Sequence, residues 1–165
     1  KINSMKKVLF ITLIFLFSLG CKKTVGKKES NISKTEKKSE YSKKISLVLS
    51  SSDNMLFDKN MLVVQSGQEV TLTLNHTGKF NKSVMGHNFV LLKDGVNVSE
   101  FAERAAAARD SEYIPEGDEV LAYTKLIGGG ESDTITFKAP MKGNYTFICS
   151  FPGHWGLMKG KLIVK

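Results

Sequence analysis

Residues 149–158, CSFPGHWGLM, place three potential metal ligands on one short segment. Cys149, His154 and Met158 offer a thiol, an imidazole and a thioether. The step from the cysteine to the histidine passes through a proline and a glycine, which favour a turn. Strands are predicted on both sides of the segment, at residues 143–149 and 159–164. We therefore expect a hairpin loop that holds three donors between two anchored strands.

The sequence after residue 44 predicts an all-β domain. Apolar and polar residues alternate over short runs that are separated by glycine-containing turns, which is typical of a sandwich or barrel. The segment 97–110 differs, because it is rich in Ala, Glu and Arg, and Asn97 and Glu100 have capping-box spacing. It predicts a short helix outside the sheets. About eight strands are expected, near residues 45–49, 61–65, 70–75, 88–92, 120–127, 134–137, 143–149 and 159–164.

A fourth donor must come from another part of the chain. His87 follows Gly86 and opens a predicted strand, and a glycine lets the backbone approach a metal closely. His76 is the competitor, but it lies in an alternating strand, where a partly buried histidine is ordinary. A thiolate, two imidazoles and a weak axial thioether suit one copper ion that cycles between Cu(I) and Cu(II). His87 is the preferred fourth ligand.

Three ordered motifs extend this comparison over residues 45–165. They are VMGHN at 84–88, TKLIG at 124–128, and CSFPGH at 149–154 followed by LMKG at 157–160. Together they strongly resemble the azurin family of cupredoxins. The resemblance implies an eight-stranded Greek-key β-sandwich with a short helical flap outside the sheet.

The resemblance also implies a role for each matched position. His87, Cys149 and His154 would be the equatorial copper ligands, with Met158 as the distant axial sulfur. The Gly86 backbone carbonyl would be an opposite axial contact. Two neighbours, Asn88 and Phe151, would support the ligands, and Asn88 would brace the ligand loop.

Members of this family exchange electrons through the exposed edge of the loop histidine, here His154. The resemblance places a docking patch around it that includes Met85, Phe151 and Pro152. Trp155 stands where a small residue is usual and is assigned to the same docking surface. The implied partners are redox proteins such as c-type cytochromes or copper and haem reductases, which would bind a monomer briefly.

The first 44 residues predict export and tethering. Lys6 and Lys7 precede a short apolar run, which is typical of a signal peptide over residues 1–20. The run ends in Ser18-Leu19-Gly20-Cys21, which resembles the lipidation motif of bacterial lipoproteins. A membrane anchor through lipidated Cys21 is therefore expected. Residues 21–44 are lysine-rich and lack large apolar side chains, so they predict a disordered tether ahead of a copper-binding domain at 45–165. We expect the domain to lie in the periplasm or cell envelope.

The charge distribution argues against nucleic acid as a partner. The formal net charge is +8, but residues 1–44 alone hold twelve lysines and three glutamates. Residues 45–165 hold twelve basic and thirteen acidic residues, so the expected domain is nearly neutral. It therefore lacks the basic face of a nucleic-acid-binding protein.

Three other functions fit the sequence less well. A copper oxidase or nitrite reductase needs further metal centres, and only His76 remains as a spare imidazole. A periplasmic copper buffering or delivery protein could use the same ligands, although a chaperone needs open, exchangeable thiols. A metal-free adhesion domain with a sandwich fold would not explain why four potential metal donors occur in this ordered arrangement. The leading expectation is a type 1 (blue) copper electron carrier that is not an enzyme by itself.

Overall fold

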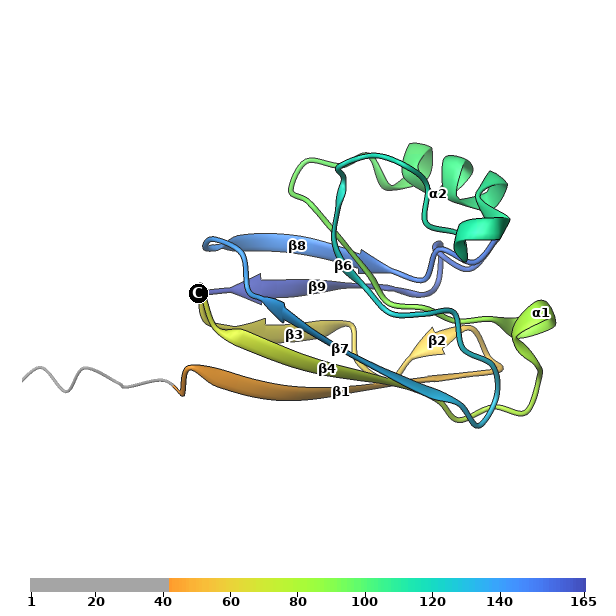
Figure 1. The fold of residues 1–165 in the computed structure, drawn as a ribbon, viewed down its shortest axis with the longest axis horizontal. Helices are drawn as coiled ribbons and strands as arrows, with labels where there is room; N and C mark the ends of the chain where they lie inside the picture. The colour runs from red at the N-terminus through yellow and green to blue at the C-terminus, as the bar shows by residue number, and fades with distance from the viewer. Residues whose placement is uncertain (1–41) are drawn as a thin grey trace, which may run out of the picture. The chain divides into compact units, whose positions relative to one another are not determined.

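The computed structural model describes residues 42–165. The predicted signal peptide, Cys21 and all but the last residues of the predicted tether lie outside them. Two β-sheets and a helical flap make up the described domain (Figure 1). The strands are β1 (Lys44–Ser52), β2 (Leu56–Phe57), β3 (Met61–Val64), β4 (Glu69–His76), β5 (Val90–Leu92), β6 (Val120–Tyr123), β7 (Ser132–Lys138), β8 (Gly143–Ile148) and β9 (Lys159–Val164). The helices are α1 (Lys82–Met85), α2 (Val98–Ala107) and the 3-10 turn η1 (Arg109–Ser111).

One sheet has the strand order β2-β1-β4-β7 and the other β3-β9-β8-β5-β6. The pairs β1/β4 and β3/β9 are parallel, and the remaining neighbours are antiparallel. The non-sequential order confirms the expected all-β sandwich with its helical flap. The described residues add a two-residue strand, β2, and a four-residue helix, α1, which the sequence patterns did not predict.

The alternation of side chains along the strands explains where the core lies. In β4, Val70, Leu72 and Leu74 are fully buried and face the opposite sheet, while the intervening residues face outward. β5 differs because both of its faces are covered. Phe89 and Leu91 join the core between the sheets, whereas Val90 and Leu92 pack beneath α2. A strand buried on both sides has a continuous apolar run, as seen here.

The helix begins as the sequence predicts. The Asn97 side chain accepts hydrogen bonds from the Ser99 and Glu100 amides and so caps α2. The helix buries Phe101 and Ala105 against the outer face of the second sheet. It ends at Ala107 rather than continuing to residue 110, and η1 follows it. None of the helices within residues 42–165 is long and apolar enough to cross a membrane.

Candidate metal centre

The predicted hairpin loop joins β8 to β9 as expected. β8 ends at Ile148, and the Cys149 amide donates to the Met158 carbonyl over 2.9 Å, which closes the loop. Inside it, the Met158 amide donates to the His154 carbonyl over 2.8 Å. Gly153 has φ +82°, a left-handed conformation that glycine adopts without strain. The backbone of the loop is therefore fixed by its own hydrogen bonds.

The three donor side chains of the loop are buried at one end of the sandwich. Cys149 and Met158 are fully buried, and His154 keeps only 4% of its surface exposed. The Cys149 Sγ lies 3.7 Å from His154 Nδ1 and 3.8 Å from the Gly86 carbonyl oxygen. The Gly86 carbonyl thus reaches the thiol, on the side where an axial contact is expected.

His87 reaches the same place from the segment just before β5, the strand that pairs with β8. It forms an isolated bridge with Ile127 just before β5, and its ring centroid lies 5.2 Å from that of His154. The His87 side chain is fully buried, and neither ring nitrogen has a hydrogen-bond partner within residues 42–165. Burial of an imidazole without a partner is costly. Desolvation, together with the neighbouring His76 and His154, lowers the pKa of His87 to about 3.

His76 is excluded as a ligand by its own contacts. Its ring is also buried, but Nε2 lies 2.9 Å from the Met85 carbonyl oxygen and Nδ1 accepts from the Gly78 amide over 3.0 Å. Both nitrogens are therefore occupied, with the proton on Nε2. His76 instead stacks against His87. The preference for His87 over His76 follows from this difference in satisfied hydrogen bonds.

Cys149 sits in an environment that keeps the thiol protonated when no metal is bound. Burial raises its pKa to about 12, although the backbone N–H groups of Asn88 and Phe151 partly oppose this. The same two N–H groups would support the sulfur once a metal replaced the proton. Burial also lowers the pKa of His154. Both histidines are thus neutral at pH 7, the form in which imidazole binds metal.

A buried network around Asn88 ties the ligand segments together. The Asn88 Oδ1 accepts from the Ser150 amide over 2.8 Å, and its Nδ2 donates to Ser150 Oγ over 2.9 Å. Nδ2 also lies 3.3 Å from the Glu112 carbonyl oxygen. The Glu112 carboxylate accepts from the Leu126 amide over 3.1 Å. Asn88 therefore joins the segment that carries His87 to the ligand loop.

Sequence reasoning missed Ser150 and Glu112 in this network. Ser150 could have been predicted from the sequence, since it directly follows Cys149 and its hydroxyl can hydrogen-bond to an amide side chain. Glu112 has no sequence signal, because its role depends on a left-handed backbone with φ 55° that only the fold reveals.

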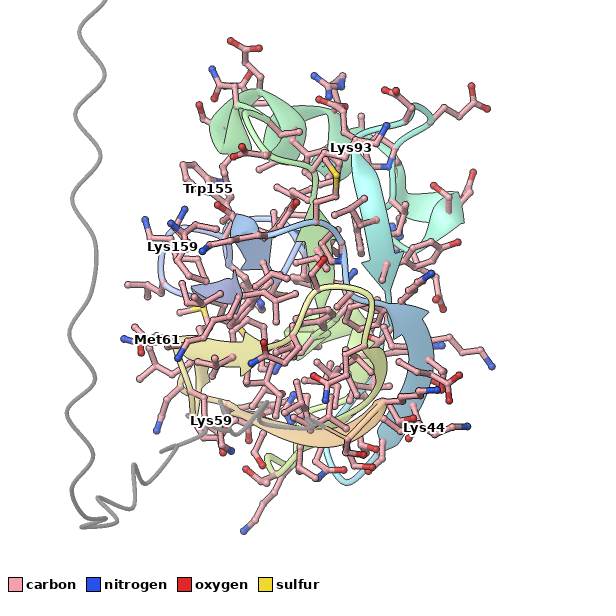
Figure 2. All side chains as sticks on the ribbon, turned by 90° about the vertical axis from the view of Figure 1, so that its left-hand side faces the viewer. Lys44, Lys59, Met61, Lys93, Trp155 and Lys159 are labelled. Carbon is pink, nitrogen blue, oxygen red and sulfur yellow. The ribbon has the colours of Figure 1, made fainter. Side chains whose placement is uncertain are left out.

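The residues assigned to docking do not all lie in one environment. Phe151 packs against His154 with ring centroids 4.7 Å apart, and Pro152 is exposed. Met85 is partly buried at the end of α1. Trp155 is partly buried too, but it packs against the cluster beneath α2, and the Lys159 ammonium lies 5.9 Å from its ring centroid. Figure 2 shows Trp155 and Lys159 next to one another on the side of the domain.

Two further apolar side chains, Val84 and Leu157, are exposed on α1 and on the ligand loop, at 58% and 60%. Both elements lie at the same end of the sandwich (Figure 1). The sequence patterns did not single them out. They extend the apolar surface around the ligand loop.

The donor set fits copper better than another common metal. Two neutral imidazoles, one thiol and one thioether form a nitrogen and sulfur site, which disfavours magnesium or calcium. Among the described residues the His, Cys, Asp and Glu side chains do not form a closed cluster of three or more metal ligands. The fit therefore depends on the unpartnered nitrogens of His87, the closeness of its ring to His154 and the buried thiol beside His154.

Comparison with known proteins gives the same result for the whole domain. The model of the family described as copper binding proteins, plastocyanin/azurin family, matches residues 43–165. The azurin of Bordetella pertussis is 46% identical over 122 residues, which is 71% of this chain and 81% of that protein.

Solved structures agree in fold. An azurin (Az-iso2) from Methylomonas sp. strain J has a TM-score of 0.66 and 35% identity over 73% of this chain and 97% of that chain. Auracyanin A, a "blue" copper protein from Chloroflexus aurantiacus, has a TM-score of 0.65 and 31% identity over 74% of this chain and 99% of that chain. This domain therefore corresponds to nearly the whole of those solved chains. The chain belongs to the plastocyanin/azurin family of copper-binding proteins.

Proposed function

We propose that this protein is a type 1 (blue) copper electron-transfer protein that moves single electrons between redox partners in the bacterial cell envelope. His87, Cys149 and His154 would hold the copper as its main ligands, with Met158 and the Gly86 carbonyl as weaker contacts. The observation that carries the proposal is the buried His87 ring, which has both nitrogens unpartnered and lies beside His154, the residue that contacts Cys149. Copper bound here supplies the one-electron couple between Cu(I) and Cu(II).

The chain contributes rigidity. The ligand loop is closed by the Cys149–Met158 backbone bond, and Asn88 joins it to the His87 segment. Donors that are held in place before and after electron transfer need little rearrangement at each step. The same rigidity disfavours a copper delivery protein, which must open its site to release metal.

Electrons would enter and leave at the ligand-loop end. His154 is the ligand with a trace of exposure, and exposed apolar side chains surround its loop. A partner such as a c-type cytochrome would dock on Met85, Pro152, Val84 and Leu157 through a small apolar contact that separates quickly. Trp155 would lie at the flank of this docking surface. The protein would work as a monomer and would not be an enzyme by itself.

The sequence before the domain supports export. We propose a signal peptide over residues 1–20, lipidation at Cys21 and a flexible tether over 21–44 that holds the domain at residues 45–165 near a membrane. This arrangement would keep the carrier in the cell envelope while leaving it free to meet its partners. Mass spectrometry of the membrane fraction would test the anchor, since a Cys21→Ser variant should lose both the lipid mass and the membrane association.

The metal site is tested by spectroscopy of residues 22–165 after addition of Cu(II). An intense blue absorption band with narrow copper hyperfine splitting is expected, and Cys149→Ser should abolish it. His87→Gln should abolish it as well, whereas the matched change His76→Gln should leave the band in place. A pale, ordinary Cu(II) spectrum that Cys149→Ser leaves unchanged would overturn the proposal. Copper that a Cu(I) chelator removes within seconds would favour the buffering function instead.

A further inference from the structure

The end of the sandwich opposite the ligand loop, called here the distal end, is built from four segments. They are the entry into β1 at residues 42–44, the β3–β4 loop at 65–68, the β7–β8 turn at 139–142, and Lys165. Backbone hydrogen bonds join them: the Glu69 amide donates to the Lys43 carbonyl, the Gly67 amide to Ala139 and the Ser66 amide to Lys165. The Gln68 side chain adds a bond to the Ser42 carbonyl. These segments therefore form one fixed surface.

The distal end is rich in lysine. Five exposed lysines lie on its segments or immediately beside them, namely Lys43, Lys44, Lys138, Lys142 and Lys165. Glu69 is the acidic side chain among them, and it pairs with Lys44 over 2.8 Å. Lys43, Lys44, Glu69 and Lys138 border an open hollow of about 510 Å³. Figure 2 looks onto this end of the domain and labels Lys44 at its edge.

An exposed apolar side chain accompanies these lysines. Met141 is 80% exposed, the highest value among the large exposed apolar residues of the described domain. It lies at the tip of the β7–β8 turn next to Lys142, and the Tyr145 hydroxyl donates to the Met141 carbonyl over 2.8 Å, which holds the turn. Lysines around a protruding apolar tip suit the boundary between lipid headgroups and acyl chains.

The ligand-loop end has a different charge balance. Its exposed lysines include Lys79, Lys82, Lys125 and Lys159, and several carboxylates lie among them. Lys82 is 3.9 Å from Glu112, and Asp133 accepts from the Lys125 amide. Asp53 accepts from the Lys79 amide. The lysines of the ligand-loop end are therefore interspersed with acidic side chains, whereas the five distal lysines have Glu69 alone among their segments.

The acidic segment before β6 does not cancel the distal lysines. Asp118 is paired with Lys93 over 2.9 Å, and Glu119 is paired with Arg104 of α2. Both pairs lie along the side of the domain under α2. Figure 2 shows Lys93 there, well separated from Lys44.

We propose that the distal end binds the surface of an anionic phospholipid bilayer, with Met141 entering the headgroup region. The sequence that precedes the domain supports a membrane as the occupant, because residues 22–44 are lysine-rich and β1, which follows them, starts at this end. Anionic lipid attracts such lysines additively within a Debye length. A domain held in this way presents the ligand loop to the opposite side, where a redox partner can reach it. The inference concerns a surface separate from the metal centre and holds with or without lipidation of Cys21.

The test uses residues 42–165, which correspond to nearly the whole of the solved relatives, and the blue copper band of the isolated domain checks that it is folded. Binding is measured by sedimentation with vesicles of equal phosphatidylglycerol and phosphatidylcholine at low salt, and with phosphatidylcholine alone. The variant Lys43→Glu/Lys138→Glu/Lys142→Glu is compared with Lys79→Glu/Lys82→Glu/Lys125→Glu, which has the same net charge. All six lysines are exposed, so both variants should fold, and their circular dichroism checks this.

The unmodified domain should bind the anionic vesicles and not the neutral ones. The distal variant should lose at least about tenfold in partition coefficient, since each lysine near such a surface contributes about fivefold. The matched variant should lose less than about threefold, and Met141→Ser should weaken binding without changing its salt dependence. Equal losses in both triple variants would mean that only net charge matters, and no preference for anionic lipid would mean that this surface does not bind membranes. Either result would overturn the inference and leave the blue copper spectrum, and hence the proposed function, unaffected.

Discussion

The imidazole rings of His76 and His87 lie parallel, with centroids 4.2 Å apart and planes inclined by 4°. Only His87 has free ring nitrogens, because the nitrogens of His76 are occupied by the Met85 carbonyl and the Gly78 amide. The His76 ring is therefore held in place by its own hydrogen bonds, and by stacking it fixes the orientation of the His87 ring. A ligand whose angle is set by packing does not depend on the metal for its position.

His76→Leu should lower the free energy of unfolding by about 2–4 kcal/mol. The change leaves the Met85 carbonyl and the Gly78 amide without partners in a buried place, and each such group costs about 1–3 kcal/mol. Copper should still bind, since no donor is lost. Chemical denaturation of the copper-free domain measures the loss, with Thr73→Val on the outer face of the same strand as the control. A loss below 1 kcal/mol would show that His76 does not hold this region.

The copper-free domain should become less stable as the pH falls below 6.5. In the folded state the pKa of His87 is lowered to about 3 by burial, whereas the unfolded chain takes up the proton near 6.5. The unfolded state therefore binds more protons between these values. The contribution is fully present above pH 6.5 and is lost at about 1.4 kcal/mol per pH unit as the pH falls toward 3.

Denaturation of the copper-free domain at pH 7.5 and 5.0 measures this dependence. His87→Gln removes the titrating group and should flatten the dependence of the unfolding free energy on pH. His76→Gln leaves the buried, unpartnered imidazole of His87 in place and should keep that dependence. An unchanged slope in His87→Gln would contradict the assignment. Copper-loaded protein should show a dependence at least as steep, because loss of the metal on unfolding also lets Cys149 take up a proton.

Copper binding at pH 7.5 should release one proton from Cys149. Burial raises the pKa of this thiol to about 12, so it is protonated before the metal arrives and must be deprotonated to bind. Calorimetric titration in two buffers with different ionisation enthalpies counts the released protons. Ellman's reagent should also react slowly with the folded, copper-free domain and quickly after denaturation. Release of no proton would mean that the thiolate already exists in the folded domain.

The sequence singled out the candidate donor residues but not all of the residues that hydrogen-bond around them. Cys149, His154 and Met158 lie on one loop, and loop ligands can be identified from spacing alone. His87 needed a choice between two histidines, which the structure explains through hydrogen bonds that no spacing reveals. The strand near 88–92 starts two residues late, at Val90, because His87 before it forms only an isolated bridge with Ile127. Similarly, the strand near 120–127 stops at Tyr123, after which Thr124 and Leu126 turn to hydrogen-bond Phe89 and Glu112.

Trp155 is a residue whose surroundings could not be predicted from the sequence. Its position beside His154 in the sequence suggested the docking surface, but adjacent residues in a loop can face different ways. The ring packs under α2 with Val90 and Phe101 as part of the outer cluster. Only the fold shows that this cluster lacks a cover on that side, which explains why a large aromatic residue is accommodated there.

Gly86→Ala should weaken copper binding and destabilise the domain. A Cβ on Gly86 would lie 2.5 Å from the Lys82 carbonyl oxygen and 2.9 Å from the Phe151 ring, so the backbone must shift. The shift would move the Gly86 carbonyl away from Cys149 and disturb the start of the His87 segment. Overpacking of this kind costs about 1–3 kcal/mol. Gly156→Ala is the matched control, because a Cβ there meets nothing within 4 Å. Equal effects of the two changes on the copper spectrum and on stability would contradict the close-contact argument.

Leu157→Asp should slow electron exchange without changing the metal centre. Leu157 is 60% exposed and lies on the ligand loop next to Met158, so an added charge faces any partner that approaches His154. In self-exchange the same surface meets itself, and two carboxylates repel across the contact. NMR line broadening in mixtures of the reduced and oxidised protein should give a rate at least about tenfold lower at low salt, with partial recovery at high salt as the charges are screened. Val48→Asp provides the control, because Val48 is 51% exposed on β1 and adds the same charge away from the loop. If both variants slowed exchange equally, the electron would not pass through the ligand-loop surface, and the docking assignment of Met85 and Pro152 would fail with it.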